Sequence, residues 1–152
     1  MKAIEFMGGD WALINGTPRK VQAVDCVDNE IMADDELYTL AEDRYHSEDK
    51  VEGVPITPEI LAKNGFKIVF GFGYSESYPT YGWGYLRGMR DYATVDVRFY
   101  SEPIGGVSRL VKMETASEKD DGINSIHSCD IEFIHELQHA MRLCGIEKEI
   151  EL

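Results

Sequence analysis

Two largely apolar runs near the start of the chain, separated by a polar turn, predict a β-hairpin. Residues 10–14 and 20–25 are rich in residue types that favour strands, and residues 15–18 between them read Asn-Gly-Thr-Pro. Asparagine and glycine adopt the backbone angles of tight turns at low cost. We therefore expect residues 10–25 to form a hairpin within a small N-terminal β-barrel-like part.

The pattern changes at residue 57, where the chain carries residues that begin a helix. Thr57 can act as the N-cap, Pro58 suits the first helical position, and Glu59 is favourable near the positive end of the helix dipole. Gly65 can adopt the left-handed conformation that ends a helix. These residues predict one short helix at about 58–64.

After this helix, aromatic and β-branched residues predict further strands. Residues 66–74 and 81–87 form two such runs, residues 94–100 and 107–113 resemble a second hairpin, and residues 123–130 contain one short strand. Glycines interrupt the first run at positions 71 and 73 and the second run at positions 82 and 84. A further glycine, Gly88, follows the second run. Glycine at such positions indicates bulges or the close approach of another backbone.

The last periodic segment has the spacing of an amphipathic helix. Apolar residues recur at steps of three, four and three from Ile134 to Cys144. Asp130 is suited to the N-cap and Gly145 to the end of the helix. We expect this C-terminal helix at about 131–144.

Together these elements predict a single α+β domain over residues 1–152, in which both helices pack on a bent antiparallel sheet. No apolar stretch approaches the roughly 18 residues of a membrane span, and residues 1–6 have no apolar leader segment. The three cysteines, Cys26, Cys129 and Cys144, are odd in number and widely spaced, which favours reduced thiols. We expect a soluble cytoplasmic protein.

The charge of the chain is strongly negative and unevenly distributed. The net charge is −13, and residues 25–52 contain eleven acids against Arg44 and Lys50. This density predicts an exposed acidic loop or excursion at about 25–52. A nucleic-acid-binding protein needs the opposite charge, so direct binding of nucleic acid is not expected. The segment is instead a candidate cation site or an acidic surface that mimics nucleic acid.

The residues His135-Glu136-Leu137-Gln138-His139 fit the zinc peptidase motif H-E-x-x-H. Histidines four residues apart on a helix can bind one zinc ion, and the glutamate can activate a zinc-bound water. Catalytic zinc requires a third protein ligand, and few residues follow the motif. His127 and Cys129 are the upstream candidates, and with the two histidines they could form a closed structural site.

Helical geometry gives this motif a simpler interpretation. At 100° per residue, one polar face of the helix faces away from the apolar stripe. The residues of this face are His135, Gln138, His139 and Arg142. Arg142 would repel a metal ion beside it. We therefore expect a polar helix face, no metal site, no catalytic residue and no cofactor, and we lean against an enzyme.

The segment Tyr81-Gly82-Trp83-Gly84-Tyr85 is the candidate binding site. On a strand, Tyr81, Trp83 and Tyr85 point to one face and the glycines leave the other face bare. The aromatic row either packs the core or is exposed as a platform for a partner, with Arg87 and Arg90 beside it.

Residues 131–150 read IEFIHELQHAMRLCGIEKEI, and residues 54–66 read VPITPEILAKNGF. Both strings resemble a family of small proteins encoded by phages and mobile elements of gut bacteria. The resemblance implies that the position of Glu136 is often glutamine and that the position of His139 varies, which does not suit a catalytic base and a zinc ligand. No activity is known for this family, so the resemblance implies no function.

Three hypotheses for the function follow. The chain is expected to be a non-enzymatic interaction or accessory module that binds a protein partner, in an oligomeric state that the sequence leaves open. The first alternative is a zinc-dependent hydrolase that uses His135, Glu136 and His139. The second alternative is an acidic mimic of nucleic acid, or a regulator, that acts through residues 25–52.

Overall fold

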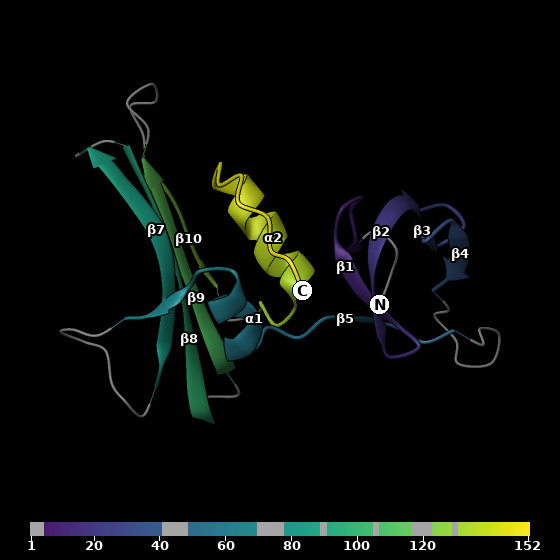
Figure 1. Ribbon diagram of the computed structural model, residues 1–152, viewed down its shortest axis with the longest axis horizontal. Helices are drawn as coiled ribbons and strands as arrows, with labels where there is room; N and C mark the ends of the chain where they lie inside the picture. The colour runs from purple at the N-terminus through teal and green to yellow at the C-terminus, as the bar shows by residue number, and fades with distance from the viewer. Residues whose placement is uncertain are drawn as a thin grey trace. The chain divides into compact units, whose positions relative to one another are not determined.

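The computed structural model describes residues 5–40, 49–69, 78–88, 91–104, 107–116, 123–128 and 131–152. The chain divides into two compact units. Unit 1 is Met1–Pro55 with Phe133–Gln138, and unit 2 is Ile56–Glu132 with His139–Leu152. The α+β class is confirmed, but the structure has two antiparallel five-stranded sheets where one bent sheet was expected (Figure 1). The single domain stays a prediction, because the chain divides into these two units.

Unit 1 contains the predicted N-terminal hairpin. The strand order of its sheet is β4-β3-β2-β1-β5. The strands are β1 (Trp11–Ile14), β2 (Thr17–Asp25), β3 (Glu30–Ala33), β4 (Glu36–Thr39) and β5 (Val51–Gly53). At the turn between β1 and β2, Asn15 and Gly16 have φ angles of 52° and 79°. These are the left-handed angles that asparagine and glycine tolerate best, so the turn residues specify this hairpin.

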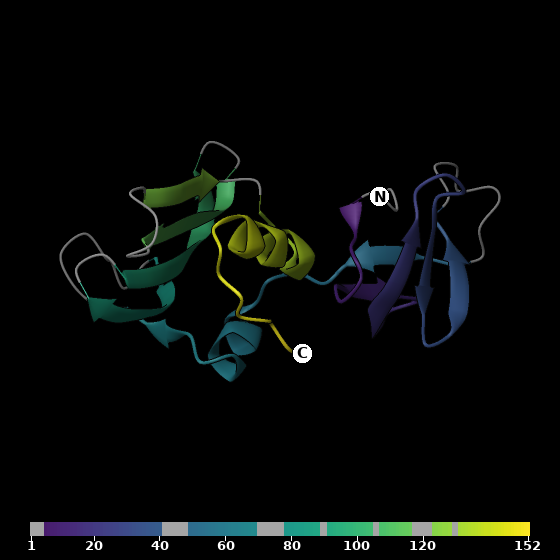
Figure 2. The same cartoon turned by 90° about the horizontal axis from the view of Figure 1, so that it is seen from above.

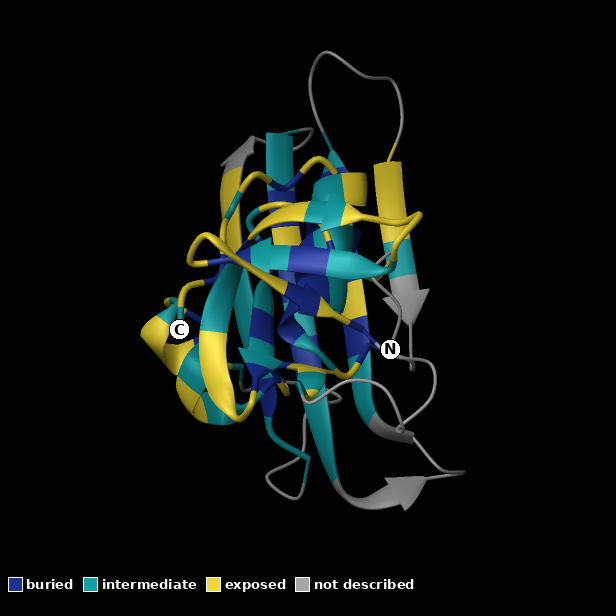
Figure 3. Ribbon diagram, turned by 90° about the vertical axis from the view of Figure 1, so that its right-hand side faces the viewer, coloured by how far each residue is buried: buried dark blue, intermediate teal, exposed yellow. Residues whose placement is uncertain are grey.

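Strand β2 changes its partner along its length. Its first residues pair with β1 and its last residues with β3, and the register shifts between Val21 and Ala23. This bulge inserts Gln22 and resets the alternation of the side chains. In Figure 3, buried positions alternate with intermediate and exposed positions along the strands. The buried side chains form the core of unit 1: Phe6, Ala12, Ile14, Val21, Ile31, Ala33, Tyr38 and Leu40. The described strands form no closed barrel, so the barrel-like part stays a prediction.

The expected loop across residues 25–52 is wrong for much of the described part of that segment. β3 and β4 form a hairpin there, and β5 follows at Val51. Ile31 and Ala33 are fully buried, and Tyr38 is 6% exposed. The acidic residues of the two strands are interspersed with these buried residues. Carboxylates can therefore remain in water while the apolar positions pack into the core. Residues 41–48 lie outside the described residues.

Unit 2 contains the second sheet, with the strand order β10-β9-β8-β7-β6 (Figure 2). Its strands are β6 (Lys67–Ile68), β7 (Thr80–Gly88), β8 (Asp91–Ile104), β9 (Val107–Ala116) and β10 (Ile123–Ser128). The hairpin predicted between residues 94 and 113 is confirmed, with longer strands, as is the short strand after residue 123. Of the strand expected at 66–74, the described part is only β6, since residues 70–77 lie outside the described residues.

Two glycines of β7 are explained by close contacts. A Cβ atom on Gly84 would lie 2.4 Å from the backbone oxygen of Ala93, and one on Gly82 would lie 2.4 Å from Val69 Cγ2. Real Cβ atoms do not approach other atoms so closely. A larger residue would require a shift of the neighbouring strand at Gly84, and a shift of the Val69 side chain at Gly82. The predicted close approach of another backbone is thus confirmed at Gly84.

Helix α1 (Pro58–Lys63) agrees with the prediction. The hydroxyl of Thr57 accepts a hydrogen bond from the Ile60 amide at 3.3 Å, and Gly65 has a φ angle of 80°. A hydrogen bond from its own backbone amide, and a second one with the Thr57 side chain, lower the pKa of Glu59. After the helix, the Asn64 side chain donates to the backbone oxygen of Glu151 and accepts from its amide. This pair of bonds ties α1 to the C-terminal segment.

Helix α2 (Ile134–Leu143) begins three residues later than expected. Its N-cap is therefore Phe133, and the predicted cap Asp130 lies outside the described residues. Gly145 ends the helix with a φ angle of 74°, as predicted. Neither helix in the described part of the chain is long and apolar enough to cross a membrane.

Candidate functional site

The first histidine of the H-E-x-x-H motif is packed inside unit 1. His135 is 1% exposed. The centre of its ring lies 4.6 Å from that of Phe6, and 5.8 Å from that of Phe133 with the two planes only 7° apart. A Cβ atom on Gly53 would lie 2.9 Å from His135 Cε1. The imidazole is therefore part of an aromatic cluster that needs a glycine on β5 to accommodate it.

The glutamate of the motif, Glu136, caps the N-terminus of α2. The backbone amide of Phe133 donates to Glu136 Oε2 at 3.0 Å. A glutamate three residues after the N-cap makes this bond in the capping box. Its negative charge is also favourable at the positive end of the helix dipole. The amide oxygen of a glutamine could accept the same bond.

The predicted polar face of α2 is not wholly exposed. Gln138 is only 4% exposed, and His139 and Arg142 are half-buried. Two residues of the face that helical geometry places away from the apolar stripe, His135 and Gln138, are thus buried, because the neighbours of a helix decide which of its faces is covered. Arg142 forms an ion pair with Glu149, with 3.4 Å between Arg142 Nη2 and Glu149 Oε1.

The structure leaves part of the proposed metal set untested. Among the described residues, no three His, Cys, Asp or Glu side chains form a group that could hold a metal ion. Cys129 lies outside the described residues, and so does the side chain of His127. The four-residue zinc site is therefore an open hypothesis. The side chains of Arg87 and Arg90, expected beside the aromatic row, also lie outside the described part.

The aromatic residues Tyr81, Trp83 and Tyr85 lie on one face of β7, at the border of the unit 2 core. Their partners on β8 are buried aliphatic residues: Val97, Val95 and Ala93. The centre of the Trp83 ring lies 6.5 Å from that of Phe66 and 5.4 Å from the Lys148 ammonium. Trp83 is half-buried, and Tyr85 is 40% exposed. Trp83 thus lies beside Phe66 at the edge of the core, and a binding role for the row stays a prediction.

The two cysteines in the described part are both free thiols in different surroundings. Cys26 is exposed and Cys144 is buried. Burial raises the pKa of the Cys144 thiol. The hydroxyl of Thr115 on β9 donates to the backbone oxygen of Cys144 at 2.7 Å. Cys144 therefore serves as a small core residue, whereas Cys26 does not.

The largest concentration of charge in the described residues is the acidic hairpin, which we define as residues 25–40. It contains six acids and no lysine, arginine or histidine. Those acids are Asp25, Asp28, Glu30, Asp34, Asp35 and Glu36. All are exposed except Glu30, which is half-buried. The hairpin therefore presents six carboxylates on one supersecondary element.

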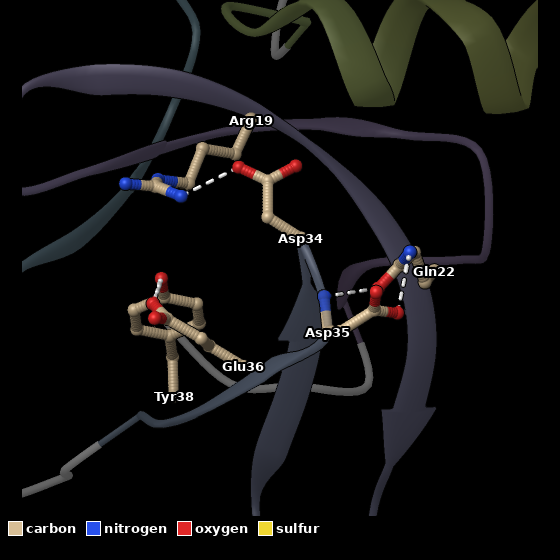
Figure 4. A network of polar contacts seen from close by, with 6 residues as sticks. All are labelled: Arg19, Gln22, Asp34, Asp35, Glu36 and Tyr38. Carbon is tan, nitrogen blue, oxygen red and sulfur yellow. Dashed lines mark hydrogen bonds and ion pairs between the residues drawn. The ribbon is translucent and has the colours of Figure 1, made fainter.

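Contacts within unit 1 hold the tip of the acidic hairpin in place (Figure 4). Arg19 Nη1 lies 2.5 Å from Asp34 Oδ2. The Asp35 amide donates to Gln22 Oε1 at 2.8 Å, and Gln22 Nε2 donates to Asp35 Oδ1 at 3.2 Å. The Tyr38 hydroxyl donates to Glu36 Oε2 at 2.6 Å, and this hydrogen bond raises the pKa of Tyr38. The carboxylates are thus carried on an ordered hairpin.

One surface feature was missed by the sequence analysis. Ala23, Met32 and Leu37 are paired across β2, β3 and β4, and Leu37 is 66% exposed. The alternation within residues 30–39 could have revealed the two outward-facing residues of β3 and β4. Ala23 could not be placed with them, because the bulge at Gln22 changes the alternation of β2.

Searches with the sequence against models of protein families and curated proteins, and with the structure against solved structures, find no match. The family resemblance of residues 54–66 and 131–150 therefore stays a prediction.

Proposed function

We propose that the chain is a non-enzymatic interaction module that binds a basic protein partner through the acidic hairpin. The observation that carries this proposal is the six carboxylates of residues 25–40, which no basic residue interrupts. Such a concentration of charge steers an oppositely charged partner and speeds its association. An origin in a phage or mobile element and a cytoplasmic location belong to the same proposal.

The residues of the H-E-x-x-H motif support this choice over the hydrolase. His135 packs between two aromatic rings, and Glu136 accepts the hydrogen bond of the helix cap. Both side chains therefore have structural roles that account for their presence. The negative charge of the hairpin also disfavours nucleic acid as the partner, because phosphates would be repelled.

A capture experiment with charge-matched variants tests the proposal. The full chain is immobilised and exposed to a lysate of the organism that encodes it, and captured proteins are identified by mass spectrometry. The hairpin variant carries Asp25→Asn, Asp28→Asn, Glu30→Gln and Glu36→Gln. The control variant removes the same number of charges outside the hairpin, with Glu132→Gln, Glu147→Gln, Glu149→Gln and Glu151→Gln.

We expect the wild type and the control variant to capture the same basic protein, and the hairpin variant to lose it. The captured amount should fall as the salt concentration rises, because exposed charges are screened over about 10 Å at 0.1 M salt. Equal capture by the hairpin variant would contradict the proposal. So would a wild-type chain that captures only acidic or neutral proteins.

A further inference from the structure

The outward face of β2, β3 and β4 carries an apolar row, which we define as Ala23, Met32 and Leu37. Met32 and Leu37 belong to the acidic hairpin, and Ala23 lies on the strand beside it. The three residues lie directly opposite one another, in the pairs Ala23↔Met32 and Met32↔Leu37. Ile31 and Ala33 beside Met32, and Tyr38 beside Leu37, are buried in the core, so the row faces the other side of the sheet. Ala23 and Leu37 are exposed and Met32 is half-buried. Since neighbouring strands are about 4.8 Å apart, the row runs across the strands for about 10 Å.

Acidic residues flank the apolar row on both sides. On one side, Asp25 pairs with Glu30 across β2 and β3, two residues along the strands from the row. On the other side, Asp34 and Asp35 form the turn between β3 and β4, where their φ angles are 52° and 63°. Two residues of strand span about 6.7 Å. The row therefore lies between two lines of acidic residues, of which Asp34 is already paired with Arg19.

We propose that the apolar row binds a basic amphipathic helix of the partner protein, an inference that rests on the proposed function. A helix with its side chains is about 10–12 Å wide. Lying along the row, it would place an apolar stripe on Ala23, Met32 and Leu37. Lysines or arginines on both shoulders of the helix would then reach the carboxylates on either side. An extended strand matches less well, because its alternate side chains would point away from the surface.

Charge favours a basic helix over the other possible partners of the apolar row. The acidic lines would repel an anionic lipid surface and nucleic acid. They would also repel the same face of a second copy of this chain. The contact is small, since it is centred on three side chains, so we expect weak and salt-dependent binding of the kind seen in transient complexes.

A designed peptide provides a direct test. The probe is a fluorescein-labelled helical peptide of leucine, lysine and alanine, with leucines three and four residues apart and lysines on both sides of the leucine stripe. One control peptide has the same composition with the leucines dispersed around the helix, and another has glutamate in place of lysine. Binding to the full chain is measured by fluorescence anisotropy.

The decisive variant is Leu37→Ser, and the matched control is Val27→Ser. Val27 is 91% exposed and lies in the turn between β2 and β3, outside the row. We expect Leu37→Ser to weaken binding of the probe about tenfold or more, because burial of a leucine side chain is lost. Val27→Ser should leave binding unchanged, and both variants should unfold at the wild-type temperature. Neither control peptide should bind as the probe does.

Three results would overturn the inference. They are equal binding of the probe by Leu37→Ser, equal binding of the dispersed peptide, and self-association of the chain that Leu37→Ser abolishes. The captured partner separates this inference from the proposed function. If the hairpin variant loses the partner and Leu37→Ser retains it, the acidic hairpin is the binding element and the apolar row is not. If the hairpin variant retains the partner, the proposed function fails.

Discussion

Gly53 shows how one residue can determine the packing of unit 1. A Cβ atom at this position would lie 2.5 Å from Phe133 Cγ and 2.9 Å from His135 Cε1. The Phe133 ring stacks on the buried imidazole of His135, so both rings belong to one aromatic cluster. No local pattern in the sequence distinguishes this glycine from a turn glycine. Its requirement comes from a segment about 80 residues later in the chain, where Phe133 and His135 lie.

We therefore expect Gly53→Ala to destabilise the protein. Overpacking of a close-packed site costs about 1–3 kcal/mol, and here both neighbours are rigid aromatic rings. The loss should be measured as a lower free energy of unfolding in urea, followed by circular dichroism. The control is Glu52→Ala on the same strand, where the exposed ion pair with Lys50 contributes little. A Gly53→Ala protein as stable as the wild type would show that the cluster is not packed as described.

At the scale of elements, helix α2 shows that the periodicity of apolar residues predicts a helix more reliably than residue types predict where the helix begins. The spacing of its apolar residues predicts a helix, and the structure contains one. The start was misplaced because Asp130 is a favourable cap by type, whereas the observed cap uses the Glu136 side chain and the Phe133 amide. A phenylalanine N-cap has no side-chain oxygen, so the usual cap preferences do not identify it.

Substitution of Glu136 tests its capping role. Glu136→Ala removes the cap bond and should lower the free energy of unfolding by about 1 kcal/mol. Glu136→Gln can keep the bond and loses only the charge, so we expect a smaller loss of about 0.5 kcal/mol. Urea unfolding measures both. Equal losses in the two variants would argue against the capping box.

At the scale of the whole molecule, each unit contains a tyrosine bonded to a carboxylate. The Tyr38 hydroxyl donates to Glu36 in unit 1, and the Tyr92 hydroxyl donates to Glu114 in unit 2. In both cases the hydrogen bond is the main cause of a raised phenol pKa. A raised pKa in the folded protein means that the stabilising contribution is present below pH 10 and is lost as the pH rises through the folded pKa.

We expect substitution of either tyrosine to remove the dependence of stability on alkaline pH that its own hydrogen bond causes. Tyr92→Phe and Tyr38→Phe should each lack one late-ionising phenol in an absorbance titration at alkaline pH. Glu114→Gln should make Tyr92 ionise at a lower pH than in the wild type, because the carboxylate that holds its proton is gone. Wild type and Tyr92→Phe should also become more similar in stability above pH 10. If Glu114→Gln leaves the titration unchanged, the hydrogen bond does not control Tyr92.

The sequence by itself determined the features that depend on neighbouring residues. The Asn15-Gly16 turn, the Thr57 cap and the glycines that end both helices require particular backbone angles or side-chain oxygens, and these are properties of residue type. The hairpin of β8 and β9 could likewise be predicted, because its alternation is unbroken along most of both strands.

The tertiary structure decided which surfaces are covered. The acid count of residues 25–52 favoured a loop, yet contacts with other strands made Ile31, Ala33 and Tyr38 a buried face. Helical geometry placed His135 on the polar face of α2, away from the apolar stripe, yet the cluster with Phe6 and Phe133 buries it. The apolar row of Ala23, Met32 and Leu37 also exists only once three strands are paired. Whether a residue is buried depends on neighbours that are distant in the sequence, and a local sequence pattern does not contain these neighbours.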